Sequence, residues 1–269
     1  YVWGRREGNK ELTRVRLDTG LRTLVWRQVL EGEEAATFGQ CYSIRPKSTF
    51  PGGFIPVQLE DHAFALGPDG SFYLGFRNDA AEGNGIVRIS PDGATCTVLT
   101  RWNGTMGEVG GGASPQYSTL EGFGVHAGKL YASLQIGKHL LAIDLATGDR
   151  ALIANPAGSV GSTPGQSTMF WDATRGLWIT AGGIQSYLAT AIDLTTGLRQ
   201  SLFLTAPGMP IESAPPWETG AHGAIDNGNY QGYGALALDP DDNDHVYMVI
   251  KWGLLKYELS TGNSYVMSQ

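Results

Sequence analysis

Two stretches of the chain, Ala142-Ile-Asp-Leu-Ala-Thr-Gly148 and Ala191-Ile-Asp-Leu-Thr-Thr-Gly197, follow one pattern. Each begins with a short apolar run that ends in Asp, and each closes with Thr-Gly. Short apolar runs bounded by turn residues are typical of β-strands. The glycine can adopt the positive φ that a tight hairpin requires. The pattern therefore predicts two strands joined by a hairpin.

Four segments share a longer order of elements around this hairpin. An apolar run, a turn, a run with an aromatic residue and a variable loop precede a third run, which an Asp-Gly or Thr-Gly turn joins to a fourth. Four antiparallel strands that recur every ~40–60 residues are the signature of a β-propeller. We predict an all-β chain, with one β-propeller domain over residues 1–269 and four-stranded antiparallel blades at 60–102, 119–155, 167–204 and 232–269.

A further blade is visible at residues 1–30, which makes five, but its innermost strand is missing. Its second, third and fourth strands are predicted at 1–4, 12–17 and 22–26. A ring closed on this blade would leave an unpaired strand edge. We expect a segment upstream of residue 1 to supply the missing strand, with six blades in the intact protein as the alternative count. Otherwise the strand lies within the irregular stretch 31–61.

Charge and hydropathy exclude two classes of partner. The chain of 269 residues has a net charge of −7 and only 17% charged residues. An acidic chain disfavours nucleic-acid binding, and no apolar run approaches the ~20 residues of a transmembrane helix. The charge is unevenly spread: residues 1–27 carry seven basic and three acidic side chains, a net +4, so the remainder carries −11.

Two features bear on the compartment. The chain opens at Tyr1 without an initiator methionine or an apolar leader, so we interpret it as a processed product or a fragment whose export signal has gone. Cys41 and Cys96 match no zinc-site spacing. They form either one disulfide of an exported protein or two separate buried thiols. We expect a secreted, periplasmic or cell-surface protein.

The repeats resemble several propeller families. Residues 65–74 and 86–93 are similar to NHL, gluconolactonase-like and streptogramin-lyase-like repeats, and residues 142–148 and 191–197 are similar to YVTN-like and quinoprotein-like blades. Both resemblances imply the propeller fold. Quinoprotein blades place a docking Trp shortly after Thr-Gly, and only Trp26 stands in that position here, so we predict no cofactor.

The gluconolactonase-like resemblance implies a metal ligand at one position. Those enzymes use an acidic residue at the head of an inner strand, within Glu-Gly-Pro, and Glu121-Gly122-Phe123 matches it in part. The other ligands of that family are not matched around Thr168 and Gly232, so we predict no metal site. The acidic stretch Asp239–Asp244 is similar to the start of a calcium loop but lacks the glycine and distal glutamate of an EF-hand.

Propeller ligands usually bind where the loops that enter the inner strands meet those that join the second and third strands. That geometry predicts a mixed polar funnel with an aromatic side chain, which suits a carbohydrate, a peptide or a protein surface. The chain lacks the motifs of serine hydrolases, zinc proteases and phosphate loops, so no catalytic residue is assigned. The predicted funnel residues are Asp61, His62, Arg77, Asn78, Glu121, Gln135, Lys138, His139, Gln185, Tyr230, Lys251 and Trp252.

Three functions are consistent with these features. We expect a non-catalytic exported propeller that acts as a recognition or assembly module, through its loop face or its open first blade, with a protein partner or another copy of itself. The long loops 103–119, 155–167 and 205–230 carry little charge, which is typical of surfaces covered by a neighbouring chain. The alternatives are a metal-dependent lactonase-like hydrolase or lyase, with His62 or His139 as the acid–base group, and a lectin-like carbohydrate binder.

Overall fold

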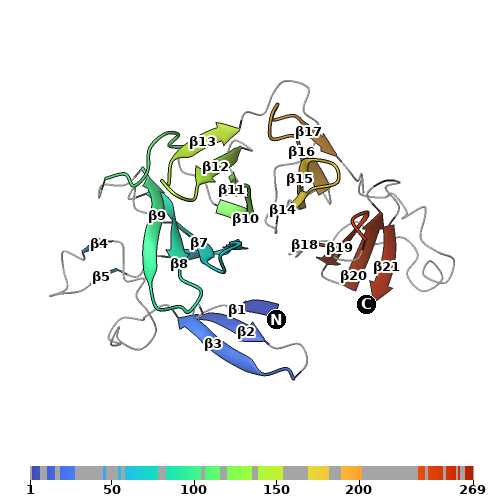
Figure 1. Cartoon of the computed structure of the whole chain (residues 1–269), viewed down its shortest axis with the longest axis horizontal. Coiled ribbons are helices and arrows are strands. Elements are labelled where there is room, and N and C mark those ends of the chain that lie inside the picture. The colour runs from blue at the N-terminus through green and yellow to red at the C-terminus, as the bar shows by residue number, and fades with distance from the viewer. Residues whose placement is uncertain are drawn as a thin grey trace. The chain divides into compact units, whose positions relative to one another are not determined.

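The fold consists of β-strands throughout the part of the chain that can be described. The computed structural model describes residues 2–6, 11–15, 19–27, 45–46, 54–55, 58–77, 83–103, 107–115, 120–134, 139–153, 169–181, 189–201, 236–239, 242–250, 253–258, 260 and 264–268. Within these residues every regular element is a strand, and the paired strands are antiparallel (Figure 1). The prediction of an all-β, propeller-type chain is confirmed. Over the same residues we find no helix with the length and apolar character needed to cross a membrane.

The chain divides into two compact units. Unit 1 comprises Tyr1–Thr119 together with Asp144–Arg150, and unit 2 comprises Leu120–Ile143 together with Ala151–Gln269. Each unit is described by itself below. The segment Asp144–Arg150, which returns to unit 1, carries a turn that packs on the strand Cys96–Trp102.

Unit 1 contains two larger sheets and a short strand pair. Sheet 1 has the order β1-β2-β3, with β1 at Val2–Arg6, β2 at Glu11–Val15 and β3 at Arg22–Arg27. Sheet 2 has the order β6-β7-β8-β9, with β6 at Gln58–Leu66, β7 at Phe72–Arg77, β8 at Asn84–Ile89 and β9 at Cys96–Trp102. The strands β4 (Arg45–Pro46) and β5 (Phe54–Ile55) pair with each other.

The remaining sheets each have four strands in sequence order. Sheet 3 consists of β10 (Leu120–His126), β11 (Lys129–Leu134), β12 (Leu140–Asp144) and β13 (Arg150–Ile153). Sheet 4 consists of β14 (Met169–Asp172), β15 (Leu177–Ala181), β16 (Ala189–Ile192) and β17 (Arg199–Ser201). Sheet 5 consists of β18 (Leu236–Leu238), β19 (His245–Ile250), β20 (Gly253–Glu258) and β21 (Ser264–Ser268).

The strands lie where the repeat predicts them, and sheet 1 has the three strands expected for an incomplete blade. The stretch 31–61, the alternative location of the missing inner strand of the first blade, contains β4, β5 and the start of β6 among its described residues. These strands pair with each other or with β7, and none of them extends sheet 1. The number of blades in the intact protein stays a prediction.

The repeated Asp and Thr-Gly residues build the hairpin between the third and fourth strands. The side chain of Asp144 accepts hydrogen bonds from the amides two and three residues later, at 2.8 and 3.0 Å, and Asp193 does the same at 2.7 and 3.2 Å. Gly148 and Gly197 have φ values of 76° and 74°, which favour glycine. The Asp and Gly positions that the two stretches share therefore each have a local structural role in the turn.

Aromatic side chains fill the cores that join successive sheets. In unit 1, Trp26 of β3 is 1% exposed and packs in a cluster with Phe72 and Ile89 of sheet 2. In unit 2, Trp178 of β15 is fully buried and packs over Gly124 of β10, where an added Cβ would lie 2.4 Å from the indole ring. Sheets 1 and 2, and sheets 3 and 4, are thus held to each other by tryptophan packing.

Candidate functional site

Three predicted funnel residues lie on the described strands of unit 1. Asp61 and His62 lie in β6, inside the shift of register between Leu59 and Phe64, and Arg77 is the last residue of β7. A register shift of this kind is a β-bulge, which bends a strand and re-aims its side chains. The inner strand of sheet 2 is therefore irregular at the polar pair that the sequence singles out.

Two further funnel residues lie at one end of sheet 3. Glu121 falls in the register shift of β10 between Leu120 and Phe123, and Leu120 pairs with Leu134 of β11. The backbone amide of Leu134 donates to the carbonyl of His139, at 3.0 Å. The backbone pairing places Glu121 and His139 at the same end of sheet 3, and their role in a site stays a prediction. The Nδ1 atom of His139 is buried and has no hydrogen-bond partner.

The funnel as one site stays a prediction. The residues above belong to two separately described units, and the others fall outside the described residues: Asn78, Gln135, Lys138, Gln185, Tyr230, Lys251 and Trp252. Within the described ranges, no group of three or more His, Cys, Asp or Glu side chains is arranged to hold a metal ion.

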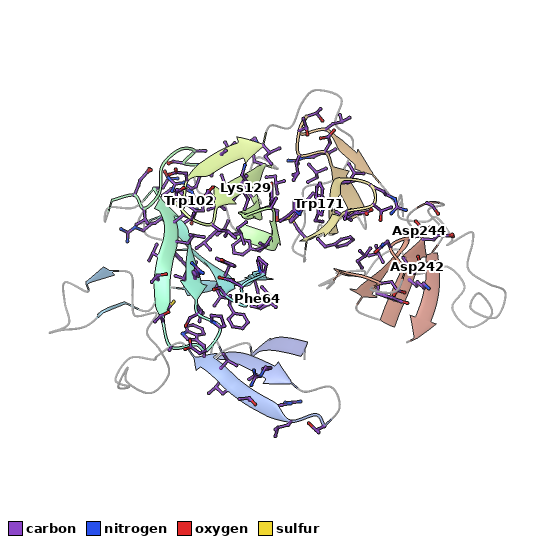
Figure 2. The ribbon with its side chains drawn as sticks, viewed as in Figure 1. Phe64, Trp102, Lys129, Trp171, Asp242 and Asp244 are labelled. Carbon is purple, nitrogen blue, oxygen red and sulfur yellow. The ribbon has the colours of Figure 1, made fainter. Side chains whose placement is uncertain are left out.

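In the acidic turn that resembles a calcium loop, the described carboxylates contact other groups of the protein; Figure 2 labels Asp242 and Asp244. Asp239 accepts a hydrogen bond from the hydroxyl of Tyr247 at 2.8 Å. Asp242 accepts one from the amide of Asp244 at 3.0 Å and contacts the imidazole of His245 at 2.5 Å. These contacts order the turn between β18 and β19.

Asp244 also connects two sheets of unit 2. Its carboxylate binds Arg175 in the turn between β14 and β15, and it accepts a hydrogen bond from Ser260. Arg175 in turn donates to the buried Asp172 at 2.9 Å and to the carbonyl of Asn243 at 3.1 Å. The guanidinium of Arg175 therefore joins sheet 4 to sheet 5 through the carboxylates of Asp172 and Asp244. We call this arrangement the Arg175 latch.

The latch predicts a loss of stability in acid. Burial alone would raise the pKa of Asp244, but hydrogen bonds from Ser260 and Arg175 outweigh it and lower that pKa below its usual 3.8. A carboxyl group whose pKa is lower in the folded than in the unfolded state stabilises the fold at pH values above the unfolded-state pKa. This stabilisation is lost as the pH falls through the folded-state pKa. We expect Asp244→Asn to cost about 1 kcal/mol at neutral pH and to flatten the decline below pH 3.8. Urea unfolding over a pH series measures both effects, and an unchanged acid slope would contradict the assignment.

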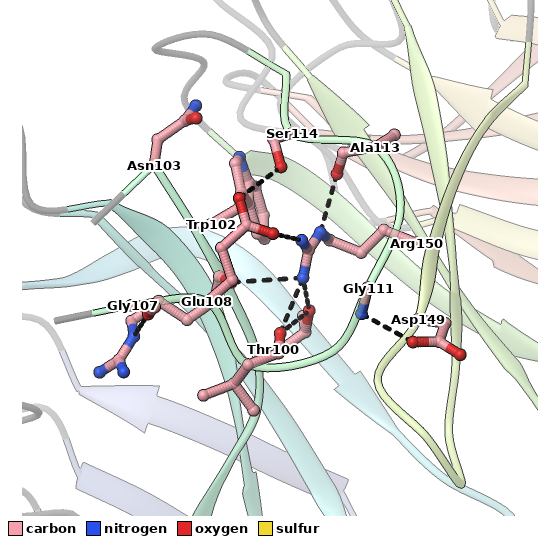
Figure 3. A network of polar contacts seen from close by, with 12 residues as sticks. Thr100, Trp102, Asn103, Gly107, Glu108, Gly111, Ala113, Ser114, Asp149 and Arg150 are labelled. Atoms are coloured by element: carbon pink, nitrogen blue, oxygen red, sulfur yellow. Dashed lines mark hydrogen bonds and ion pairs between the residues drawn. The ribbon is translucent and has the colours of Figure 1, made fainter. Parts of the chain in front are cut away.

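The most extensive polar network in the described residues surrounds Arg150, the first residue of β13 (Figure 3). Its side chain is buried at 4% exposure. One terminal nitrogen donates to Thr100 Oγ1 at 2.6 Å and to the carbonyl of Val109 at 2.7 Å, and Nε donates to the carbonyl of Ala113 at 2.8 Å. The other terminal nitrogen pairs with Glu108 at 2.8 Å.

This Arg150 network binds the turn of sheet 3 to the end of sheet 2. The guanidinium lies 5.5 Å from the ring centroid of Trp102, and Asp149 accepts a hydrogen bond from the amide of Gly111 at 2.7 Å. Burial lowers the pKa of Arg150, and Glu108 opposes part of that shift. The described part of the low-charge loop, residues 107–115, is thus anchored by contacts within its own chain, although Glu108, Gly111 and Ser114 stay exposed. Its cover by a neighbouring chain stays a prediction.

Sequence reasoning missed Arg150, although a signal for it was present. The tetrapeptide Thr-Gly-x-Arg occurs at 19–22, 147–150 and 196–199, each time at the turn into a fourth strand. Arg150 and Arg199 are both buried, at 4% and 2% exposure. An arginine repeated at one blade position, directly after the turn glycine, marks a structural contact rather than a solvated charge.

The turn glycine makes a second contact with the preceding sheet. A Cβ added to Gly148 would lie 2.1 Å from the carbonyl oxygen of Leu99 in β9. A Cβ added to Gly93, in the corresponding turn of sheet 2, would lie 2.0 Å from the carbonyl of Val25 in β3. The turn between the third and fourth strands therefore packs on the outer strand of the sheet before it, and only glycine allows this approach.

The same turn of sheet 1 is open. Among the residues that the structure describes, a Cβ added to Gly20 would meet no atom within 4 Å. Arg22 is exposed, unlike its buried counterparts, and Leu21 and Leu24 are 58% and 37% exposed. We define Thr19–Leu24 as the open turn; it has the residues of a packed turn without the packing.

Cys96 of β9 is disulfide-bonded. Its pairing with Cys41 stays a prediction, because Cys41 lies outside the described residues. A non-reducing peptide map is expected to show one linked pair that contains both cysteines. We expect Cys96→Ser to cost about 2–4 kcal/mol of unfolding free energy. Labelling of either thiol in the unreduced protein, or a link between two copies, would contradict the pairing.

Comparison with known proteins supports the fold. No family model and no curated protein matches the chain. It is similar to a structural genomics protein of unknown function from Bacteroides thetaiotaomicron VPI-5482, with 13% identity and a TM-score of 0.53 over 98% of this chain and 54% of that one. It is also similar to a chain of the nidogen/laminin complex, with 11% identity and a TM-score of 0.50 over 97% and 90% of the two chains. This chain spans about half the length of the Bacteroides protein. At these identities the likeness shows the fold alone, which is the β-propeller.

Proposed function

We propose that this propeller is a non-catalytic, exported recognition or assembly module that binds protein through its open turn. The observation that carries the proposal is the contrast between two copies of one tetrapeptide. At 147–150 the glycine and arginine pack on another strand, and at 19–22 their counterparts are exposed. An exposed surface that has the residues of a packed one is a natural place for a partner.

Other properties of the open turn favour a protein partner. Leu21 and Leu24 expose apolar surface beside the arginine, and residues 1–27 carry a net charge of +4. Interfaces combine apolar contact with arginine, and a basic patch directs the approach of acidic partners. A solved chain of similar fold comes from a nidogen/laminin complex, so the fold is compatible with protein binding. The disulfide at Cys96 favours an oxidising compartment.

Native mass spectrometry tests the proposal. The protein is isolated from its natural source under mild conditions, and its native mass is compared with the denatured mass of its chain. We expect a native mass that exceeds one chain, through further copies or a second protein. A single-chain mass at every concentration would count against the proposal. If the protein then hydrolyses a lactone in the presence of divalent metal, the proposal is overturned in favour of an enzyme; if it binds on a glycan array, the proposal is overturned in favour of a lectin.

A further inference from the structure

The packed turn of sheet 3 shows what the open turn is built to bind. Gly148 packs closely against the backbone carbonyl of Leu99 in the outer strand β9. Arg150 then binds Thr100 of that strand, two carbonyl oxygens of the loop that follows it, and the carboxylate of Glu108. The occupant of such a turn is therefore an outer strand, followed closely by a loop with an acidic side chain.

The open turn has the same local geometry as the packed one. The Oγ1 atom of Thr19 accepts a hydrogen bond from the amide of Leu21 at 3.3 Å, and Thr147 accepts the corresponding bond from Asp149 at 3.2 Å. Gly20 has a φ of 67° and Gly148 one of 76°. The described residues 19–24 thus already have the backbone form of the packed turn, which limits the conformational entropy that they lose when a strand docks.

The open turn lacks the surroundings of the packed one, and it has Leu21 where the packed turn has Asp149. Arg22 begins β3, just as Arg150 begins β13. Arg150 is 4% exposed and holds Glu108, whereas Arg22 is exposed and no described side chain binds its guanidinium. The open turn therefore offers the glycine and the guanidinium donors that the packed turn uses.

We propose that the open turn docks an outer strand of a second copy of this chain, with Gly20 against a strand carbonyl and Arg22 on a carboxylate. This inference rests on the proposed function and specifies its partner. Charge complementarity favours a second copy, because residues 1–27 carry +4 and the rest of the chain carries −11. The contact joins different surfaces of the two copies, so it is heterologous and extends to rings or filaments.

The test measures self-association of the purified chain by sedimentation velocity, from micromolar to millimolar concentration. Two variants address the contact, Arg22→Glu and Gly20→Ala. Each has a matched control outside the open turn. Lys129→Glu makes the same charge reversal on an exposed residue, and Gly128→Ala adds a methyl group at a glycine of φ 73° with no atom within 4 Å. Circular dichroism and thermal melting check that all four variants fold.

We expect both open-turn variants to raise the self-association Kd at least about tenfold, because each removes a buried, charge-assisted or close-packed contact. Both controls should keep the wild-type value. Association that survives Arg22→Glu and Gly20→Ala, or that falls equally with Lys129→Glu, would overturn the open turn as the binding surface; a recognition or assembly module that binds through another surface would still stand. A wild-type chain that stays monomeric would overturn the second copy as occupant. In that case the proposed function stands only if the protein from its natural source is bound to a different protein.

Discussion

Replacement of Arg150 by leucine is expected to lower the free energy of unfolding by about 3 kcal/mol. The side chain is 4% exposed and donates to Thr100 Oγ1 and to the carbonyls of Val109 and Ala113. The leucine side chain cannot donate a hydrogen bond, so these three acceptors lose the guanidinium donors and face an apolar side chain instead. Because the arginine joins the turn of sheet 3 to the end of sheet 2, its loss should also release residues 107–115.

Urea unfolding measures the first effect, and amide hydrogen exchange of the loop measures the second. Arg88→Leu is the matched control. Arg88 also forms an ion pair, with Asp69, but the two side chains are 43% and 45% exposed. Exposed pairs contribute about 0–1 kcal/mol, so this variant should change stability little. Equal effects of the two substitutions would show that the Arg150 network does not hold the turn Asp144–Arg150 on β9 and on the loop that follows it.

The second large effect is expected at Gly148. Gly148→Ala should cost about 3 kcal/mol or more, from left-handed backbone strain and from overpacking against a backbone carbonyl. The added methyl group would lie 2.1 Å from the Leu99 carbonyl oxygen, and a carbonyl in a strand cannot rotate away. Gly20→Ala is the matched comparison. It carries the same strain at φ 67° without any atom in the way, so it should cost about 1 kcal/mol in the isolated chain.

A third variant separates the strain from the contact. Asparagine adopts positive φ more readily than alanine, so Gly148→Asn reduces the strain and keeps the added Cβ. It should therefore remain strongly destabilising, whereas Gly20→Asn should be nearly neutral. Chemical denaturation of all four variants provides the comparison. Similar losses at positions 20 and 148 would mean that the Leu99 contact yields at little cost.

The strands and hairpins of this chain could be predicted from the sequence because their causes are local. The apolar run 140–144 became β12, and the Asp and Thr-Gly residues after it form their turn through contacts within six residues of one another. Such contacts depend on residues that are adjacent in the chain, so a single sequence contains the whole cause. The incomplete sheet 1 followed from the same reasoning.

The candidate site was predictable only in part, for the same physical reason. Blade order predicts Glu121 and His139 at one end of sheet 3, and the strand register is consistent with that place, whereas their role in a site stays a prediction. The alternation of apolar residues in the sequence gives no sign of the register shifts in β6 and β10, so these shifts could not be predicted. The significance of the open turn also escaped sequence reasoning, because its residues are unremarkable until their surroundings are known.

The sequence by itself determined most of the described strands, their turns and the grouping of sheets 2 to 5 into four strands each, but not the pair β4 and β5. Only the tertiary structure decided what the Thr-Gly-x-Arg turn does at each place. The same four-residue pattern is packed on a neighbouring strand at 147–150 and exposed at 19–22. The hydrogen bond within the turn is equal in both, but the contacts that bury Arg150 come from residues about 40–50 positions earlier in the chain. Burial is a property of those distant neighbours, and a local pattern cannot specify them.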